Sequence, residues 1–272
     1  MTTADFSDLV NRIDFVETTG STNADLISTG TNLPDFTVLV ADFQSAGKGR
    51  SGRDWVAPPL SSLFVSVLLK PTEFGADKFS WMPLLAGLAM SETVSHFLAG
   101  NPDQASETAG ATPKSVGLKW PNDVLVNDKK ISGVLSELLP DLSGVVIGAG
   151  LNISQAPVDL PIEAATSLHI ETQQKFSRND VLRVYLENLS GLYAALKAAA
   201  GDPIASGLKG KVDQRCITIG REVRVILPGN QELFGRAVAI DDTGRLLVQP
   251  SNGQELFAVS AGDIVHLRHS SL

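Results

Sequence analysis

Short apolar runs rich in β-branched residues alternate with two longer segments of helical periodicity along the chain. Residues 15–20, 36–42, 63–69, 116–120 and 144–153 are runs of strand length, and residues 124–126 and 131–138 flank an Asn-Asp pair as in a hairpin. Apolar positions spaced three and four apart predict helices over 78–98 and 179–200. Ser21, Thr22 and Asn23 provide capping side chains for a helix that starts at Ala24. This order of elements predicts an α/β (α+β) fold with a mixed sheet.

The pattern changes near residue 210. Beyond that point helical periodicity disappears, and short alternating runs cover residues 217–219, 222–227, 233–240, 246–249 and 255–259, separated by glycines and polar pairs. Five such strands predict a small β-barrel. We therefore expect a larger domain at 1–210 and a C-terminal barrel domain at 211–272. The polar, proline-bearing segment 101–115 is predicted to be a surface loop.

Composition narrows the class of protein. Apolar residues make up 43% and charged residues 19% of the 272 residues, which excludes an intrinsically disordered chain. The single cysteine, Cys216, rules out an intrachain disulfide and is expected to be inert core in an apolar strand. The chain has no apolar run of about 20 residues and no signal-like segment at its start, so we expect a cytoplasmic protein with no membrane association.

Charge points to a small anionic ligand. The net charge of −8 argues against a surface that coats nucleic acid. Basic residues nevertheless gather in two places, at Lys48, Arg50 and Arg53 and again at Lys119, Lys129 and Lys130. A nucleotide or carboxylate fits such islands, although ordinary solvated lysines and arginines explain the charge pattern equally well.

The sequence Gly-Lys-Gly-Arg-Ser-Gly at residues 47–52 matches G-x-G-x-x-G by letter. The dinucleotide-binding fingerprint requires a helix directly afterwards, whereas Trp55, Pro58 and Pro59 follow here. The P-loop pattern also fails, because Gly49 stands where Ser or Thr should follow Lys48. The remaining interpretations are a flexible loop whose N–H groups and cations bind phosphate, or a basic surface hairpin.

Two further segments carry candidate chemistry. Asn122 and Asp123 follow a strand and a proline stop, and a hairpin over 124–131 would bring Lys130 to the same pocket as the Asp123 carboxylate. Residues 148–152 end a strand in Gly-Ala-Gly-Leu-Asn. Small residues there permit close approach of a flat ligand and Asn152 can bind the edge of a base, but structural packing accounts for the same letters.

Taken in order, these segments resemble the motifs of biotin–protein ligases. The matching pieces are Ser-Thr-Asn at 21–23, Gln44 with residues 47–55, Lys-Trp-Pro-Asn-Asp at 119–123, residues 130–133 and residues 145–152. The resemblance implies a catalytic domain of the type shared with lipoate ligases, followed by an SH3-like β-barrel. Lys48 departs from the arginine usual in the family, which keeps the charge but loses the planar bidentate fork. The motifs begin by Ser21, so we expect a monofunctional ligase without an N-terminal DNA-binding domain.

The resemblance also implies a reaction. Biotin's carboxylate attacks the α-phosphorus of ATP, and a lysine of a biotin carboxyl carrier domain then attacks the resulting biotinyl-5′-AMP. ATP and biotin are substrates, Mg²⁺ assists, and no tightly bound prosthetic group is expected. The expected partner is the carrier domain of an acyl-CoA or pyruvate carboxylase, with no DNA and no membrane, and the expected state is a monomer or weak homodimer.

The residues that match the family's motifs take the following roles by resemblance. Arg50, Lys130 and Asp123 are the expected catalytic residues, and Asp123 is also the candidate Mg²⁺ ligand. Biotin is assigned to Ser21, Thr22, Asn23, Gln44, Gly47, Lys48, Gly49, Arg50, Lys130 and Gly133. ATP is assigned to Lys48, Arg50, Arg53, Trp55, Lys119, Asn122, Asp123 and Asn152, with Trp55 stacked on the adenine.

Three alternatives remain at this stage. A lipoate–protein ligase shares the fold and the acyl-adenylate chemistry, although the basic run at 47–53 favours biotin. A non-enzymatic biotin-sensing regulator is disfavoured by the expected lack of a DNA-binding domain. A nicotinamide-dependent oxidoreductase is the weakest, because no helix follows the glycine-rich loop.

Overall fold

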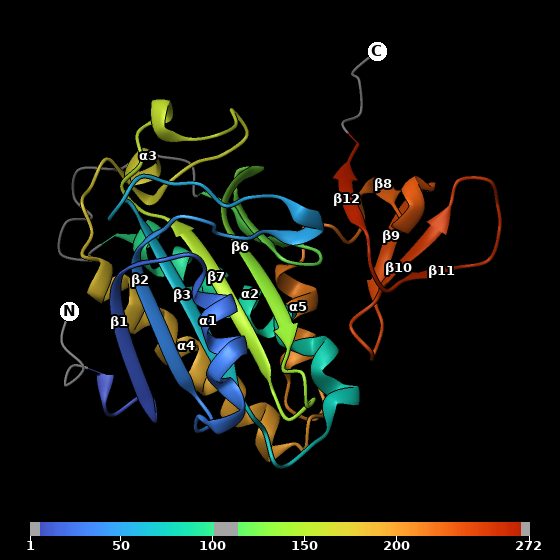
Figure 1. Ribbon diagram of the computed structural model, residues 1–272. Coiled ribbons are helices and arrows are strands. Elements are labelled where there is room, and N and C mark those ends of the chain that lie inside the picture. The colour runs from blue at the N-terminus through green and yellow to red at the C-terminus, as the bar shows by residue number, and fades with distance from the viewer. Residues whose placement is uncertain (1–5, 101–113, 268–272) are drawn as a thin grey trace.

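A seven-stranded mixed sheet forms the centre of the molecule (Figure 1). The computed structural model describes residues 6–100 and 114–267. The strands run in the order β1-β2-β3-β7-β6-β5-β4, and only β1 and β2 are parallel, joined through α1. Their bounds are β1 (Arg12–Thr19), β2 (Thr37–Gln44), β3 (Ser62–Leu69), β4 (Val116–Lys119), β5 (Asp123–Val126), β6 (Lys129–Leu138) and β7 (Val145–Asn152). The expectation of a mixed sheet is confirmed.

Helices cover both faces of this sheet. α2 (Met82–Ala99) and α4 (Arg178–Ala198) lie on one face, and α1 (Thr22–Thr29) lies on the other (Figure 1). Two shorter helices flank α4 in the chain, α3 (Leu168–Thr172) before it and α5 (Leu208–Arg215) after it. Single turns of 3₁₀ helix occur at Gly30–Asn32, Arg50–Gly52, Pro157–Asp159 and Pro228–Asn230, and a longer one at Ala76–Trp81.

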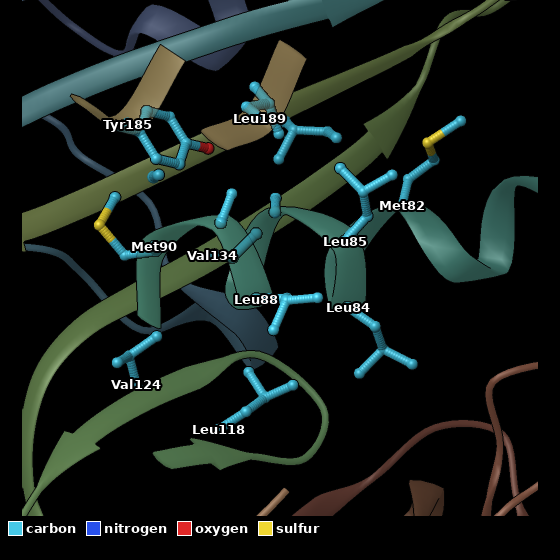
Figure 2. Packing of buried hydrophobic residues seen from close by; sticks show 14 of the residues in the cluster. Met82, Leu84, Leu85, Leu88, Met90, Leu118, Val124, Val134, Tyr185 and Leu189 are labelled. Carbon is cyan, nitrogen blue, oxygen red and sulfur yellow. The ribbon is translucent and has the colours of Figure 1, made fainter. Parts of the chain in front are cut away.

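The main core lies between the sheet and the α2–α4 pair. Figure 2 shows Leu88 of α2 pointing toward Leu118 of β4 and Val124 of β5, with Leu85 of α2 and with Tyr185 and Leu189 of α4 on the other side of the helix. Full burial of each such leucine contributes about 1.5–3 kcal/mol relative to exposure. On the opposite face, alternate strand positions such as Leu39 pack with Leu26 of α1. Two covered faces explain why the central strands are continuously apolar.

A second, five-stranded sheet follows. It consists of β8 (Glu222–Ile226), β9 (Glu232–Ile240), β10 (Leu246–Pro250), β11 (Phe257–Val259) and β12 (Asp263–His266). All neighbours are antiparallel, in the order β11-β10-β9-β8-β12. Burial alternates along β9, as expected for a small sheet with one solvated face. None of the helices in the described parts of the chain is both long and apolar enough to span a bilayer.

Several details of the C-terminal half differ from the sequence expectations. Residues 217–219 form no strand, and the fifth strand is β12 instead. Cys216 is buried, as expected, but it caps α5 and forms an isolated bridge with Leu118. The expectation of no helix beyond residue 210 is wrong, because α5 spans that position. Its periodicity is hidden since only Leu208 and Val212 are buried and Gly210 interrupts it.

The two-domain division at 210/211 remains a prediction, and it falls within α5, which packs against α2 and β4. The loop expected at 101–115 lies outside the described residues except for its last two positions.

Candidate active site

A cavity of about 670 Å³ opens over β6 and β7, within the size range of small-molecule sites. Its walls are the start of α1, residues 45–55 (called the basic loop from here on), the turn between β4 and β5, and residues 161–165. Every residue assigned to biotin or ATP from the sequence lines this cavity except Gly47. Gly47 packs just behind it, where a Cβ would lie 2.6 Å from the Trp55 carbonyl oxygen.

Hydroxyl and amide groups gather at one part of the cavity. Ser21 is the N-cap of α1, and its Oγ accepts from the Ala24 N–H. Gln44, at the end of β2, accepts at Oε1 from the Thr22 N–H (2.8 Å) and from the Thr22 hydroxyl (3.0 Å). β1 and β2 are paired, so the helix start and the strand end meet at one edge. These groups suit a ligand head that both donates and accepts hydrogen bonds.

Asn23 holds this cluster from behind. Its Nδ2 donates to the Leu135 carbonyl (3.1 Å) and to Glu137 Oε2 (2.8 Å), and the Ser66 hydroxyl lies 2.6 Å from its Oδ1. Ser66 also lies 2.7 Å from Thr22 Oγ1. Ser66 and Glu137 were not singled out from the sequence, because neither belongs to a motif. Both side chains point toward Asn23 because of where their strands lie in the sheet.

The glycines of β6 and β7 form a shelf for Trp55. Gly133 and Gly150 are paired across the two strands, and a Cβ on either would lie within 3.0 Å of the indole. The flat group that small residues admit here is therefore the side chain of Trp55 itself. Gly148 similarly admits the amide of Asn23. The indole Nε1 is buried without a hydrogen-bond partner in the structure.

A carboxylate and an ammonium group face the cavity together. Lys130 Nζ lies 2.7 Å from Asp123 Oδ1 and 5.6 Å from the centre of the Trp55 ring. The hairpin of β5 and β6 brings them together, as the sequence predicts. Lys119 lies on the same side, and burial lowers the pKa of its ammonium group. The cations therefore stand near Gly133, away from Asn23, which contacts Leu135 and Glu137 further along β6.

Arg50 reaches over the cavity from the basic loop. Its guanidinium donates from Nη1 to Asn122 Oδ1 and from Nη2 to the Gly262 carbonyl, both at 3.1 Å. Asn122 is fixed in turn by donation to the Val134 carbonyl (2.8 Å). Burial lowers the pKa of Arg50, while Asp263 and Asp123 act in the opposite direction. Asn122 thus positions the arginine with its whole amide group.

Arg53 also contacts the C-terminal sheet, through an ion pair with Asp263 at 2.9 Å. Neither Gly262 nor Asp263 was singled out from the sequence. They lie more than 200 positions from the basic loop, so only the tertiary fold reveals them.

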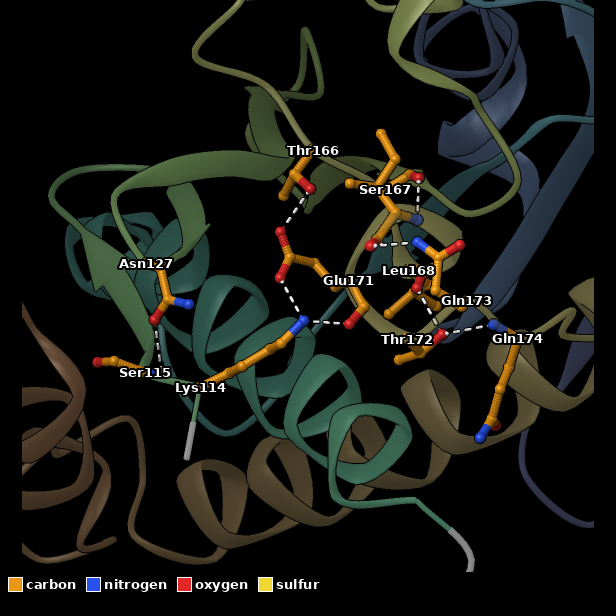
Figure 3. A network of polar contacts seen from close by, with 11 residues as sticks. Lys114, Ser115, Asn127, Thr166, Ser167, Leu168, Glu171, Thr172, Gln173 and Gln174 are labelled. Carbon is orange, nitrogen blue, oxygen red and sulfur yellow. Dashed lines mark hydrogen bonds and ion pairs between the residues drawn. The ribbon is translucent and has the colours of Figure 1, made fainter. Parts of the chain in front are cut away.

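Asn152 anchors another wall of the cavity. Its Nδ2 donates to the Thr166 carbonyl and its Oδ1 accepts from Gln155, so its contact with adenine remains a prediction. Thr166 donates through its hydroxyl to Glu171, and Lys114 pairs with the same carboxylate (Figure 3). The backbone of residues 164–166 also bonds to Lys130. This polar network holds the segment that faces the cations.

Carboxylates suitable for Mg²⁺ are few. Asp54, Asp123 and Asp128 line the cavity, but the described ranges contain no cluster of three or more His, Cys, Asp or Glu side chains that could cage a metal. Mg²⁺ bound with nucleotides commonly uses one or two carboxylates together with phosphate oxygens. Asp123 therefore fits a metal that arrives with ATP.

Comparisons with known proteins identify relatives of the whole chain. Residues 14–152 match the Biotin/lipoate A/B protein ligase family, and residues 218–267 match the Biotin protein ligase C terminal domain. A Mycobacterium tuberculosis protein named biotin--[acetyl-CoA-carboxylase] ligase is 36% identical, covering 94% of this chain and 90% of its own.

Two solved structures share this architecture. The biotin protein ligase of Aquifex aeolicus in complex with biotin and ATP is 29% identical, with a TM-score of 0.75 and coverage of 95% and 99% of the two chains. The Leishmania major biotin protein ligase in complex with biotinyl-5-AMP is 26% identical, with a TM-score of 0.61 and coverage of 92% and 99%.

Proposed function

The chain belongs to the Biotin/lipoate A/B protein ligase family, and from this premise we propose how its cavity carries out biotin ligation. Its activity is the ATP-dependent ligation of biotin to a biotin-dependent carboxylase. The lipoate alternative is not favoured, because the M. tuberculosis relative and the two solved structures are biotin ligases.

One observation carries the assignment of roles within the site. A single cavity joins the hydroxyl and amide cluster of Thr22 and Gln44 to the cations Arg50, Lys119 and Lys130. Biotin has a ureido group with one acceptor and two donors at one end and a carboxylate at the other. The cluster accommodates the ureido group, and the cations receive the carboxylate and the phosphates of ATP.

In the first half-reaction the biotin carboxylate attacks the α-phosphorus of ATP, and pyrophosphate leaves. Two anionic groups must approach each other, so Arg50, Lys48 and Lys130 neutralise charge that grows in the transition state. Asp123 orients Lys130 through their ion pair. Asp123 would hold Mg²⁺ together with the phosphates of ATP, and the bound metal would supply further charge neutralisation.

In the second half-reaction a carrier lysine attacks the acyl carbon of biotinyl-5′-AMP, and AMP leaves. The intermediate is a mixed anhydride that water destroys. Trp55, the last residue of the basic loop, lies over the glycines of β6 and β7, and the loop excludes water from the intermediate. Trp55, already seated on this shelf, offers its ring to the adenine.

We expect the acceptor to be the carrier domain of an acyl-CoA or pyruvate carboxylase and the enzyme to be a cytoplasmic monomer or weak homodimer that binds no DNA.

ATP–pyrophosphate exchange tests the activity, with biotin in one reaction and lipoate in another. Exchange with biotin alone is expected, and exchange with lipoate alone would overturn the substrate. Lys130→Ala should lower the exchange rate about 100- to 1,000-fold, the usual loss for a group that stabilises transition-state charge. Lys129→Ala is the matched control, because its side chain is exposed on the same strand and should change exchange less than about twofold. Equal losses in both variants would remove Lys130 from its role.

A further inference from the structure

The last strand of the C-terminal sheet contacts the basic loop. Gly262, directly before β12, accepts from Arg50 Nη2 at 3.1 Å, and Asp263, the first residue of β12, pairs with Arg53 at 2.9 Å. In Figure 1 the light-blue segment between β2 and β3 reaches toward the red strand β12. The two chain segments are far apart in sequence and meet beside the cavity.

The position of residues 50–53, called the tip of the basic loop from here on, depends on contacts of this kind. Its backbone bonds are local, such as Gly49 N–H to the Arg53 carbonyl and Trp55 N–H to the Gly47 carbonyl. Among the described hydrogen bonds from side chains of residues 50–53 to other segments, one reaches Asn122 and two reach Gly262 and Asp263. The C-terminal sheet therefore supplies much of what fixes the tip in place.

β12 is itself firmly placed. It pairs with β8 along its length, and His266 at its far end lies 3.0 Å from the Thr218 hydroxyl, which accepts from the Trp120 N–H. Gly262 has a φ of 155°, and a Cβ there would lie 2.8 Å from the Ile226 carbonyl oxygen. The backbone around this carbonyl is thus tightly packed, and its direction toward Arg50 is fixed.

Charge explains why an acid is needed at this position. Lys48, Arg50, Arg53, Lys119 and Lys130 crowd around one cavity. ATP and biotin neutralise them before the first half-reaction. Pyrophosphate then leaves with most of the negative charge, and biotinyl-5′-AMP retains a single phosphoryl charge. Mutual repulsion of the cations would then favour opening of the loop at the stage when water must be excluded.

We propose that Asp263 and the Gly262 carbonyl are positioning groups that hold Arg53 and Arg50 over the site between the two half-reactions. Through them the C-terminal sheet determines how much activated biotin is retained until the carrier lysine arrives. This inference rests on the proposed ligase function, because it concerns retention of the adenylate.

Asp263→Asn tests the ion pair, because it removes the charge and keeps the shape. Arg221→Gln is its matched control, since Arg221, next to β8, makes another exposed ion pair with the larger domain, at Asp128 in the turn between β5 and β6, and forms no described hydrogen bond or ion pair with the basic loop. Two quantities are measured: trypsin cleavage within residues 48–53 of the ligand-free protein, and escaped adenylate trapped by hydroxylamine as biotinyl hydroxamate, divided by the exchange rate. Both should rise about twofold to fivefold in Asp263→Asn, the range that an exposed ion pair supports, and stay at the wild-type level in Arg221→Gln.

Gly262→Ala tests the carbonyl. Its Cβ would collide with the Ile226 carbonyl and displace the acceptor of Arg50, so escape should rise about tenfold. Gly253→Ala is the control, because Gly253, in the connection between β10 and β11, also has a positive φ (77°), but a Cβ there would meet nothing within 4 Å. Thermal unfolding of both variants separates displacement of the carbonyl from general destabilisation.

The outcomes distinguish this inference from the proposed function. Wild-type levels of cleavage and escape in Asp263→Asn and Gly262→Ala would overturn the positioning role while exchange with biotin upheld the ligase. Equal increases in Arg221→Gln and Asp263→Asn would also overturn it, because they would reflect loosening between the sheets in general. Absence of exchange in the wild type would instead refute the function, and the cleavage assay would still report on the contact.

Discussion

Two of the contacts that the C-terminal sheet makes with the rest of the molecule differ in burial and chemistry. At the turn between β9 and β10, the indole N–H groups of Trp81 and Trp120 donate to the carbonyls of Asp242 (2.7 Å) and Gly244 (3.0 Å), and both tryptophans are 2% exposed. At β12, the Arg53 side chain that pairs with Asp263 is 61% exposed. The first contact therefore consists of buried tryptophan side chains whose N–H groups are hydrogen-bonded, and the second includes a solvent-exposed ion pair.

This difference implies that one contact attaches the C-terminal sheet to the larger domain and the other controls the position of the basic loop. A buried hydrogen bond is costly to break because its partner is left unsatisfied in the interior. An exposed ion pair contributes little to stability, and solvent and salt screen it. The tryptophan contact therefore keeps the sheet in place, whereas the β12 contact can be released and remade during a catalytic cycle.

The largest effect on escape of the adenylate is expected from Arg50→Gly, which removes the hydrogen bonds from the basic loop to Asn122 and Gly262 together. Escape of the adenylate should rise at least about tenfold, because the loop then loses two of its attachments. Escaped biotinyl-5′-AMP would react with lysines of bystander proteins, which a streptavidin blot detects. Labelling of the carrier protein alone would show that Arg50 has no role in closing the site.

Trp120→Phe tests the buried contact, because it removes the hydrogen bond from the indole to the Gly244 carbonyl. The substitution leaves the Gly244 carbonyl without its donor, so the free energy of unfolding should fall by about 1–3 kcal/mol. Trypsin cleavage of the basic loop in the folded protein should stay unchanged. Urea unfolding measures the first quantity, and Trp81→Phe should behave alike. Faster loop cleavage in Trp120→Phe would mean that the two contacts are coupled.

His266 gives the smallest expected effect and a dependence on pH. Burial and the nearby cations Lys119 and Arg221 lower its pKa to about 4, against a weaker opposing effect of Asp128. The unfolded chain takes up this proton near the ordinary value of about 6.5. Stability is therefore complete above about pH 6.5 and is lost as the pH falls toward 4, where the folded state also becomes protonated.

Solvent screening of this half-buried ring limits the loss to about 1 kcal/mol. In His266→Gln the fall in unfolding free energy between about pH 7 and about pH 5 should shrink by that amount. An unchanged pH profile in the variant would show that another group titrates in this range.

The sequence was most informative where chemistry is local. The strands of the larger sheet, the hairpin that joins Lys130 to Asp123 and the seat of Ser21 at a helix start follow from periodicity and turn residues. Ser66 and Glu137 could not be found in this way, because their roles arise only when β3 and β6 approach Asn23. Gly262 and Asp263 are hidden for the same reason, and α5 is hidden by its exposed surface and Gly210.

The occupant of the glycine shelf in β6 and β7 could not be predicted from the sequence either. The glycines suggested room for a flat ligand, but the chain fills that room with its own indole. The glycines correctly predicted space for a flat group, but only the fold shows that the Trp55 indole occupies this space.

The position of β7 has a consequence for how the protein folds. β6 and β7 can pair early as a hairpin, but β3 and β7 pair across the long stretch of chain that includes α2 and β4 to β6. Closing such a loop costs entropy before any contact compensates for it, so we expect this pairing to form late in folding. Thr22 and Gln44 lie on one side of that seam, and Lys130 and Gly133 lie on the other. A chain in which β3 and β7 are still unpaired therefore lacks a complete cavity. We expect the protein to gain the ability to activate biotin only when the sheet is complete.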